Sequence, residues 1–151
     1  FIARVEIERN LSYLYLNRGN PHTCLNLLEH LLKEQRAHPK ANKLHMVPTL
    51  NNLGALYSQY GKHSDAKSLF KEALTLLAEA FEGYQNGVPW AILTCNQATE
   101  LFYLEKYKAA IDTYSKALER SSIAVTEEHE LSLNIMQKLE MDSILWQFMK
   151  N

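Results

Sequence analysis

Three asparagine residues recur at regular spacing along the chain and could form one binding surface. Asn10, Asn52 and Asn96 lie 42 and 44 positions apart. An asparagine amide offers an acceptor oxygen and an NH₂ donor group, so a row of them can pair with the backbone of a bound peptide without selecting particular side chains. The same amides can instead form local or helix–helix hydrogen bonds. The spacing alone leaves both roles open.

The sequence contains no recognisable set of catalytic or metal-binding residues. It has no glycine-rich phosphate loop, and no two of its six histidines stand three or four positions apart, as a helical zinc site requires. We expect these histidines to be loop or surface imidazoles. Cys95 has no recognisable base beside it in sequence, so an activated nucleophile is unsupported. We therefore expect a non-enzymatic protein that uses no metal and no cofactor.

The composition is that of an ordinary globular domain. The chain has 151 residues, of which 46% are hydrophobic and 22% charged, which is enough to bury one sizeable core. Its formal net charge of −1 provides no overall basic field for a nucleic acid or an anionic membrane. We therefore expect no nucleic-acid partner.

Cysteine spacing and the apolar runs of the sequence indicate the cellular compartment of the protein. Cys24 and Cys95 show no paired spacing, which predicts two free thiols in a reducing environment. The longest run without a charged residue, 83–99, contains asparagine, glutamine and proline, so we expect no membrane insertion. These features favour an intracellular, cytoplasmic protein. Because residues 1–5 already have a helical pattern, we also expect the sequence to be a fragment of a larger protein.

One segment of the sequence occurs three times. The copies are GNPHTCLNLLEHLL (19–32), GKHSDAKSLFKEAL (61–74) and EKYKAAIDTYSKAL (105–118). Within each copy, apolar residues recur every three or four positions, which is the pattern of one helix face. Small residues coincide at Cys24, Ala66 and Ala110, and bulky residues coincide at Leu28, Phe70 and Tyr114. The repeated segment is therefore predicted to be a helix in which small and bulky residues occupy the same positions in all three copies.

A second helical segment precedes each copy. These segments cover roughly 5–17, 47–60 and 89–104, and turn residues such as Gly61-Lys62 separate each of them from the helix that follows. The sequence therefore predicts an all-α fold of three stacked antiparallel helical hairpins in a single domain, 1–151. The hairpins are repeat 1 (about 5–36), repeat 2 (about 47–82) and repeat 3 (about 89–122), and a C-terminal capping helix (about 127–149) brings the total to seven helices.

Gly54 stands in the middle of a predicted helix, where glycine costs about 1 kcal/mol relative to alanine. Ser12 and Ala98 occupy the equivalent positions in the other two repeats. A position with little or no side chain lets a partner helix approach closely. We therefore interpret Gly54 as a packing residue.

These residues resemble the tetratricopeptide repeat family. The family pattern of a large residue, leucine-glycine, tyrosine, alanine, phenylalanine and alanine is similar to Leu50, Leu53-Gly54, Tyr57, Ala66, Phe70 and Ala73. Repeat 1 matches at Leu11, Ser12, Tyr15, Cys24, Leu28 and Leu31. Repeat 3 is weaker, since Thr94 and Gln97 depart from the pattern. The long period is similar to that of the repeats in kinesin light chains.

The resemblance implies a right-handed α-solenoid in which the first helix of each hairpin faces a concave groove that binds a peptide segment of a protein partner. Mapped onto this chain, the groove residues are Arg9, Asn10, Tyr13, Asn17, Asn51, Asn52, Ser58, Gln59, Cys95, Asn96, Thr99, Phe102 and Tyr103. Arg9, Tyr13 and Tyr103 are the best candidates for side-chain contacts, because arginine and aromatic residues contribute much of the energy of interfaces. Their alternative role is ordinary solvated surface.

The predicted C-terminal helix has apolar residues on more than one face. One face can cap the last hairpin, whereas Trp146, Phe148 and Met149 provide a second apolar surface. This surface favours a second interface, through self-association into a homo-oligomer or through a larger complex.

Two functions remain in competition. The first is a protein–protein interaction module, an adaptor or scaffold that binds a partner peptide in the groove. The alternative is a structural subunit of a multiprotein assembly, docked or self-associated through the C-terminal helix.

Overall fold

The computed structural model describes residues 2–38, 43–80 and 88–124, and every regular element in them is a helix. The elements are α1 (Ile2–Asn17), α2 (Pro21–Ala37), the 3-10 helix η1 (Lys43–His45), α3 (Met46–Gln59), α4 (His63–Ala80), α5 (Val88–Tyr103) and α6 (Tyr107–Ala124). The predicted all-α class is confirmed. The predicted seventh helix, with Trp146, Phe148 and Met149, lies outside the described residues.

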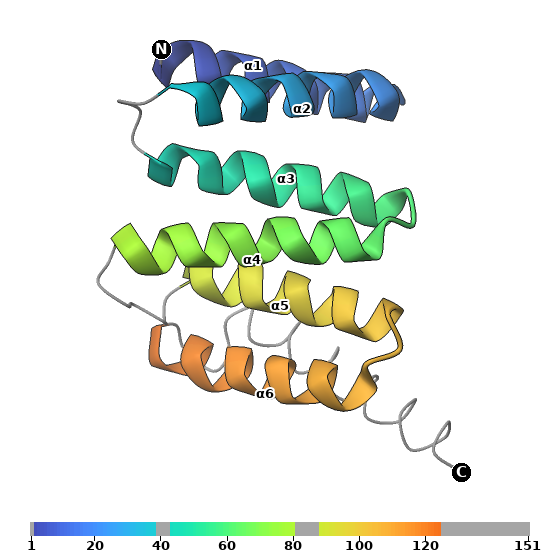
Figure 1. The fold of residues 1–151 in the computed structure, drawn as a ribbon, viewed down its shortest axis with the longest axis vertical. Helices are drawn as coiled ribbons and strands as arrows, with labels where there is room; N and C mark the ends of the chain where they lie inside the picture. The colour runs from blue at the N-terminus through green and yellow to red at the C-terminus, as the bar shows by residue number, and fades with distance from the viewer. Residues whose placement is uncertain (1, 39–42, 81–87, 125–151) are drawn as a thin grey trace.

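The α-helices form antiparallel pairs that stack in chain order (Figure 1). Within the pairs, α1 packs against α2, α3 against α4, and α5 against α6; between the pairs, α2 contacts α3 and α4 contacts α5. The second helix of each of the first two pairs therefore lies between its own first helix and the first helix of the next pair. This arrangement confirms the three stacked hairpins expected from the repeats.

Each hairpin turns through the same backbone structure. The amide of Lys62 donates to the carbonyl of Tyr57 (2.9 Å) and the amide of Gly61 donates to that of Ser58 (3.0 Å), which is the Schellman pattern of a helix end. Equivalent bonds end α1 and α5. The pattern needs one left-handed residue, which is glycine in the first two turns but Glu105, with φ 63°, in the third. The third turn thus keeps the geometry without the residue that favours it.

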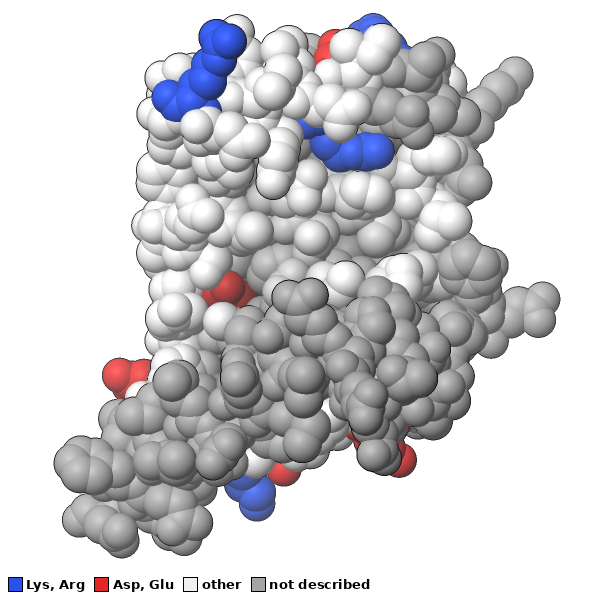
Figure 2. Space-filling model, turned by 180° about the vertical axis from the view of Figure 1, so that it is seen from behind, with Lys and Arg blue, Asp and Glu red and all other residues white. Residues whose placement is uncertain are grey.

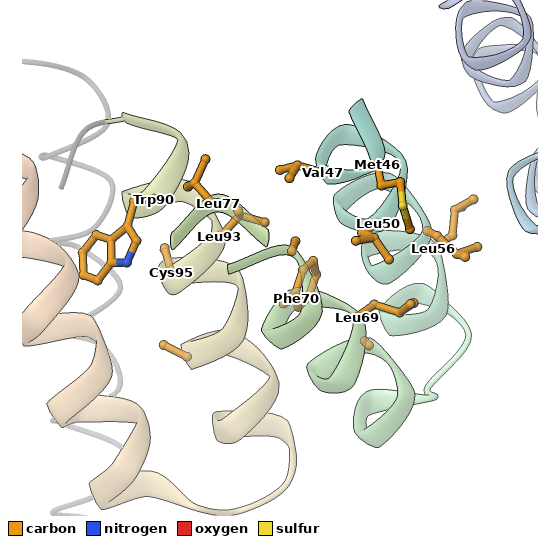
Figure 3. Packing of buried hydrophobic residues seen from close by; sticks show 14 of the residues in the cluster. Met46, Val47, Leu50, Leu56, Leu69, Phe70, Leu77, Trp90, Leu93 and Cys95 are labelled. Carbon is orange, nitrogen blue, oxygen red and sulfur yellow. The ribbon is translucent and has the colours of Figure 1, made fainter. Parts of the chain in front are cut away.

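The apolar stripes of the repeats form the core. The aligned small and bulky residues of the three copies are all buried: Cys24, Leu28, Ala66, Phe70, Ala110 and Tyr114. In Figure 3, Phe70 of α4 lies between the side chains of α3, such as Leu50, and those of α5, such as Leu93. Burial of each large side chain contributes about 1.5–3 kcal/mol, so one continuous core holds neighbouring hairpins together.

Gly54 lies against the ring of Phe70. A Cβ atom built on Gly54 would stand 2.7 Å from Cε1 and 2.9 Å from Cζ of that ring, which is closer than carbon atoms approach in proteins. The side-chain-free position on α3 is therefore what allows the aromatic residue of α4 to pack against the α3 backbone. The interpretation of Gly54 as a packing residue is confirmed.

We predict that Gly54→Ala lowers the free energy of unfolding by about 1 kcal/mol, because an overpacking penalty of about 1–3 kcal/mol exceeds the roughly 1 kcal/mol gained in helix propensity. Urea unfolding followed by circular dichroism measures the change. In a Phe70→Leu background, which makes room for the methyl group, the same substitution should become stabilising. Ala55→Gly, at the exposed neighbouring position, is the propensity control. A stabilising Gly54→Ala in the original chain would contradict this packing role.

Tyr57 links the second hairpin to the first. Its hydroxyl donates a hydrogen bond of 2.6 Å to Oε1 of Glu29 on α2. Burial raises the pKa of Tyr57 to about 12, and the hydrogen bond and negative charge of Glu29 add to the rise. Since the folded-state pKa lies above the value of about 10 for an unfolded tyrosine, the neutral phenol favours the folded state. This contribution is complete below pH 10 and is lost as the pH rises toward 12.

We therefore predict that, between about pH 10 and 12, the free energy of unfolding falls by roughly 1 kcal/mol more in the original chain than in Tyr57→Phe, after discounting for solvent screening. Urea unfolding over this pH range measures the difference. A spectroscopic titration of the phenols, with Tyr57→Phe as the blank, gives the pKa directly, and Glu29→Gln should lower it. Parallel pH profiles for the original chain and Tyr57→Phe would contradict the prediction.

Candidate functional site

A cavity between the first two hairpins brings three predicted groove residues together. Tyr13 of α1, and Asn52 and Gln59 of α3, line a space of about 150 Å³. The rest of the wall is small or apolar: Ser12, Leu16, Cys24, Leu28, Ala55 and Leu56. An apolar cavity of roughly 150 Å³ can hold a group the size of benzene. The site thus combines polar groups and an exposed aromatic ring with an apolar wall.

The wall of this cavity is chemically inert. Ser12, at the small-residue position of α1, is buried and its Oγ donates to the carbonyl oxygen of Arg9 at 2.6 Å. Cys24 is buried, and this burial raises the pKa of its thiol, so the protonated form is favoured. Both cysteines are free thiols, as the sequence predicts. The cavity is suited to holding an apolar group and offers no activated nucleophile within the described residues.

Arg9 has an unsatisfied donor. The guanidinium is half-buried on α1, and its Nη1 atom is shielded from solvent without a hydrogen-bond partner among the described residues. A buried donor on a charged group is costly to leave unpaired. Because Nη1 is covered in this structure, the Arg9 side chain must move before this donor can bond to an acceptor beside α1.

The three recurring asparagines have different environments. Asn10 is exposed on α1, and Asn52 is half-buried at the cavity. Asn96 of α5 donates from Nδ2 to Oδ1 of Asn51 on α3 at 2.8 Å, so this pair joins repeats 2 and 3. The helix–helix role left open by the sequence is therefore observed for Asn96. For Asn10 and Asn52, ligand binding stays a prediction.

Two other predicted groove residues of α5 are engaged within the third hairpin. The hydroxyl of Thr99 donates to the carbonyl of Cys95 at 3.1 Å and lies 2.5 Å from the hydroxyl of Tyr114 on α6. Cys95 itself is buried. The Thr99 side chain therefore faces α6, and the Cys95 side chain is buried in the apolar core.

The remaining predicted groove residues of repeats 2 and 3 gather around His63, at the start of α4. The Tyr103 ring stacks on the imidazole with centroids 4.4 Å apart and planes at 10°, and Ser58 Oγ lies 3.5 Å from His63 Nδ1. Phe102 meets Tyr103 edge-on at 5.8 Å. Tyr103 is also exposed, so its free side is available at the surface. The last candidate, Asn17, is exposed at the end of α1 and belongs to repeat 1, whereas this cluster belongs to repeats 2 and 3.

His63 corrects the expectation that every histidine is a loop or surface imidazole. Its Nδ1 lies 2.6 Å from Oε2 of Glu100 on α5, and the two side chains are only 20% and 3% exposed. The repeat alignment contained the signal, because Glu100 occupies the position of the buried Leu56. A carboxylate there needs a partner. Ser58 and Glu100 approach the same ring nitrogen, so they do not form a hydrolase triad, in which hydroxyl and carboxylate bind opposite nitrogens.

We predict that His63→Ala destabilises the chain by about 2–4 kcal/mol, because it leaves the Glu100 carboxylate buried without its partner. Adding Glu100→Leu, the residue type of the equivalent Leu56, should recover most of the loss. Urea unfolding of the two single variants and the double variant measures the coupling. If the double variant loses as much free energy of unfolding as the two single variants together, His63 and Glu100 are not energetically coupled, which would contradict the prediction.

Neither a metal-binding cluster nor a membrane-spanning helix is present among the described residues. Residues 2–38, 43–80 and 88–124 contain no group of three histidine, cysteine, aspartate or glutamate side chains that could hold a metal ion. Within the same ranges, none of the helices combines the length and the apolar character needed to cross a bilayer.

A family model of the tetratricopeptide repeat matches residues 3–79, just over half of the chain. The chain belongs to the tetratricopeptide repeat family. Domains of this family generally bind protein or peptide partners and are usually non-catalytic. No curated protein sequence matches this tetratricopeptide repeat chain.

Several solved structures share the fold. Kinesin light chain TPR-like repeats from Podosopora anserina align with a TM-score of 0.80 at 14% identity, covering 94% of this chain and 66% of that one. BtubC (BKLC) from P. vanneervenii aligns at 0.78 with 22% identity, covering 93% and 55%. NprR in complex with its cognate peptide NprX aligns at 0.67 with 19% identity, covering 97% and 39%. The chain thus spans less than two thirds of each, and the resemblance to kinesin light chain repeats is confirmed.

Proposed function

We propose that this tetratricopeptide repeat domain is a non-enzymatic interaction module that binds a peptide segment of a partner protein along α1, α3 and α5. The observation that carries the proposal is the cavity lined by Tyr13, Asn52 and Gln59. Its size suits one apolar side chain of a peptide, and the amides beside it suit the peptide backbone. The side chain and the backbone of the peptide would then contact α1 of the first hairpin and α3 of the second.

Arg9 of α1 and Tyr103 of α5 are further candidate contacts outside this cavity. The unpaired Nη1 of Arg9 is suited to a peptide carbonyl or carboxylate oxygen once the side chain moves to uncover it. The exposed face of Tyr103, held in place by stacking on His63, is suited to an apolar or cationic side chain. The fold relative NprR was solved with a peptide, which is consistent with this use of the architecture.

Charge favours a protein ligand over a nucleic acid. The net charge is −1, and on the face shown in Figure 2 the Lys and Arg side chains of the described residues are scattered singly. The positive charges of Lys106 and Lys71 lower the pKa of Lys67, so these three lysines form one small cluster. Binding to phosphate backbones depends on a larger basic patch or stripe than these three lysines provide. We therefore propose an uncharged or mixed-charge peptide as the ligand.

The direct test is to select peptides from a random library displayed on phage against the immobilised chain, and to measure affinity by fluorescence polarisation. We predict that Tyr13→Ala weakens the selected peptide about tenfold or more and Asn52→Ala about fivefold, through loss of an aromatic contact and of a hydrogen bond. The variants should keep the circular dichroism spectrum of the original chain.

Matched controls lie on other surfaces. Tyr60→Ala and Asn26→Ala remove the same residue types from exposed positions outside the cavity lining and should leave the affinity unchanged. Equal losses for the cavity and control variants, or failure to select any binding peptide, would count against the groove as the binding site.

A further inference from the structure

A second cavity is lined by α4, α5 and α6, where α5 lies between the other two helices (Figure 1). Its volume of about 400 Å³ is within the range of roughly 300–1,000 Å³ that is typical of ligand pockets. The α5 wall is formed by Trp90, Thr94 and Gln97, at four- and three-residue spacing. With 3.6 residues per turn, this face lies about 140° around α5 from Asn96 and Tyr103. The cavity, called the α4–α6 cavity below, is therefore separate from the peptide groove proposed above.

Two polar residues of this wall replace leucines of the preceding repeat. In the repeat alignment, Thr94 and Gln97 correspond to Leu50 and Leu53 of α3, which are 0% and 2% exposed. Thr94 is 3% exposed, and its Oγ1 has no hydrogen-bond partner among the described residues. This atom is covered, so it would contact a ligand only after rotation about χ1, which a helical threonine can make between two rotamers. Polar residues at positions that are apolar in repeat 2 indicate a wall that contacts a polar ligand.

The charges of the cavity are opposite to those at the equivalent positions between the first two hairpins. There, Glu29 and Glu72 each bond to a side chain of the neighbouring hairpin. The repeat alignment places Lys71 at the position of Glu29 and Lys116 at the position of Glu72. Both lysines line the α4–α6 cavity, and none of its lining residues is acidic. Neither lysine pairs with a carboxylate among the described residues, so both are available to an anionic ligand.

Two further lysines extend the positive charge beyond the cavity. The charge of Lys106, just before α6, lowers the pKa of Lys67 on α4, and burial and the charge of Lys71 add to this effect. Like charges held close together are unfavourable unless an anion binds between them. Lys106 and Lys116 are ten positions apart, so the four lysines extend over about 15 Å at 1.5 Å per helical residue. An extended peptide covers this distance with about five residues.

We propose that the α4–α6 cavity and the four lysines beside it form a second binding site, which takes an extended acidic segment of a partner protein. Carboxylates of the segment bind to the lysine ammonium groups, which are donors only. Backbone N–H groups of the segment bind to the hydroxyl oxygens of Thr75 and Thr113, whose protons are already donated to helix carbonyls. An acidic segment fits better than an isolated anion because the lysines extend over more than the length of one anion.

The test is fluorescence polarisation with a fluorescein-labelled peptide of about six residues, in which aspartate and glutamate alternate. We expect this peptide to bind about tenfold or more tightly than its asparagine–glutamine analogue, because hydrogen bonds between charged groups are the stronger ones. Lys71→Gln and Lys116→Gln, made together, should weaken the acidic peptide about tenfold. The matched pair Lys33→Gln and Lys108→Gln removes two exposed lysines from outside the cavity lining and should change the affinity less than about twofold.

The paired substitution Thr94→Leu and Gln97→Leu tests the cavity without changing any charge. It introduces the residue types of Leu50 and Leu53 and fills part of the space. We expect it to weaken the acidic peptide about fivefold or more, through loss of a hydrogen bond, without lowering the free energy of unfolding. Tyr13→Ala, in the peptide groove, should leave the affinity for the acidic peptide unchanged, so this site and the proposed function are tested separately.

The proposal is overturned if the acidic peptide and its analogue bind equally, or if the control lysine pair weakens binding as much as the cavity pair. The second result would show general attraction to positive charge. Unchanged binding in the Thr94→Leu and Gln97→Leu variant would show that the ligand does not enter the cavity. Displacement of the peptide by inorganic phosphate at an equal concentration would assign the site to a single small anion.

Discussion

The structure depends on one constraint: a second helix of a pair has two faces to bury, and only stacking buries both. Within its own pair, α4 covers α3 through Ala66, Phe70 and Ala73, and on its other side it packs against α5. A single hairpin would leave one of these apolar faces in water. The apolar contacts that stabilise the fold therefore also align the hairpins. The surface along the first helices exists because the hairpins are held in register.

Close approach sets the geometry of that surface. The absence of a side chain at Gly54 brings Phe70 against the backbone of α3, and Ser12 and Ala98 occupy the same small position in the neighbouring hairpins. Between hairpins, polar contacts add to the apolar core. Tyr57 reaches Glu29 from repeat 2 to repeat 1, while Asn96 reaches Asn51 and Glu100 reaches His63 from repeat 3 to repeat 2. Each of these contacts fixes one hairpin relative to the next, and with it the spacing of the proposed peptide contacts.

The features predictable from sequence are those governed by local periodicity. The helices, the hairpin turns, the buried positions such as Phe70 and the packing role of Gly54 all follow from residue spacing within a repeat or from the alignment of its copies. The family resemblance added the expected direction of stacking and the residues of the groove. The structure brings Tyr13, Asn52 and Gln59 to one cavity, and their binding to a peptide stays a prediction.

The features that sequence did not predict depend on the distance between hairpins. A change of a few ångströms in the separation of two hairpins decides whether an asparagine bonds to the neighbouring helix or stays available to a ligand. Asn96 is close enough to Asn51 to bond to it. Similarly, His63 follows the turn of its hairpin and has the pattern of a surface residue, and only the position of α5 reveals Glu100 as its partner. The left-handed conformation of Glu105 is also set by the repeated turn and not by its residue type.

We propose that the aligned first helices form the peptide-binding surface of this tetratricopeptide repeat domain. Nuclear magnetic resonance mapping of the chain with a library-selected peptide tests this most directly, because it locates the contact without altering any residue. We expect the largest chemical-shift changes at the side-chain amides of Asn52 and Gln59 and at the ring of Tyr13. Largest changes on the exposed surface of α2 and α4, at residues such as Asn26 and Ser68, would contradict it.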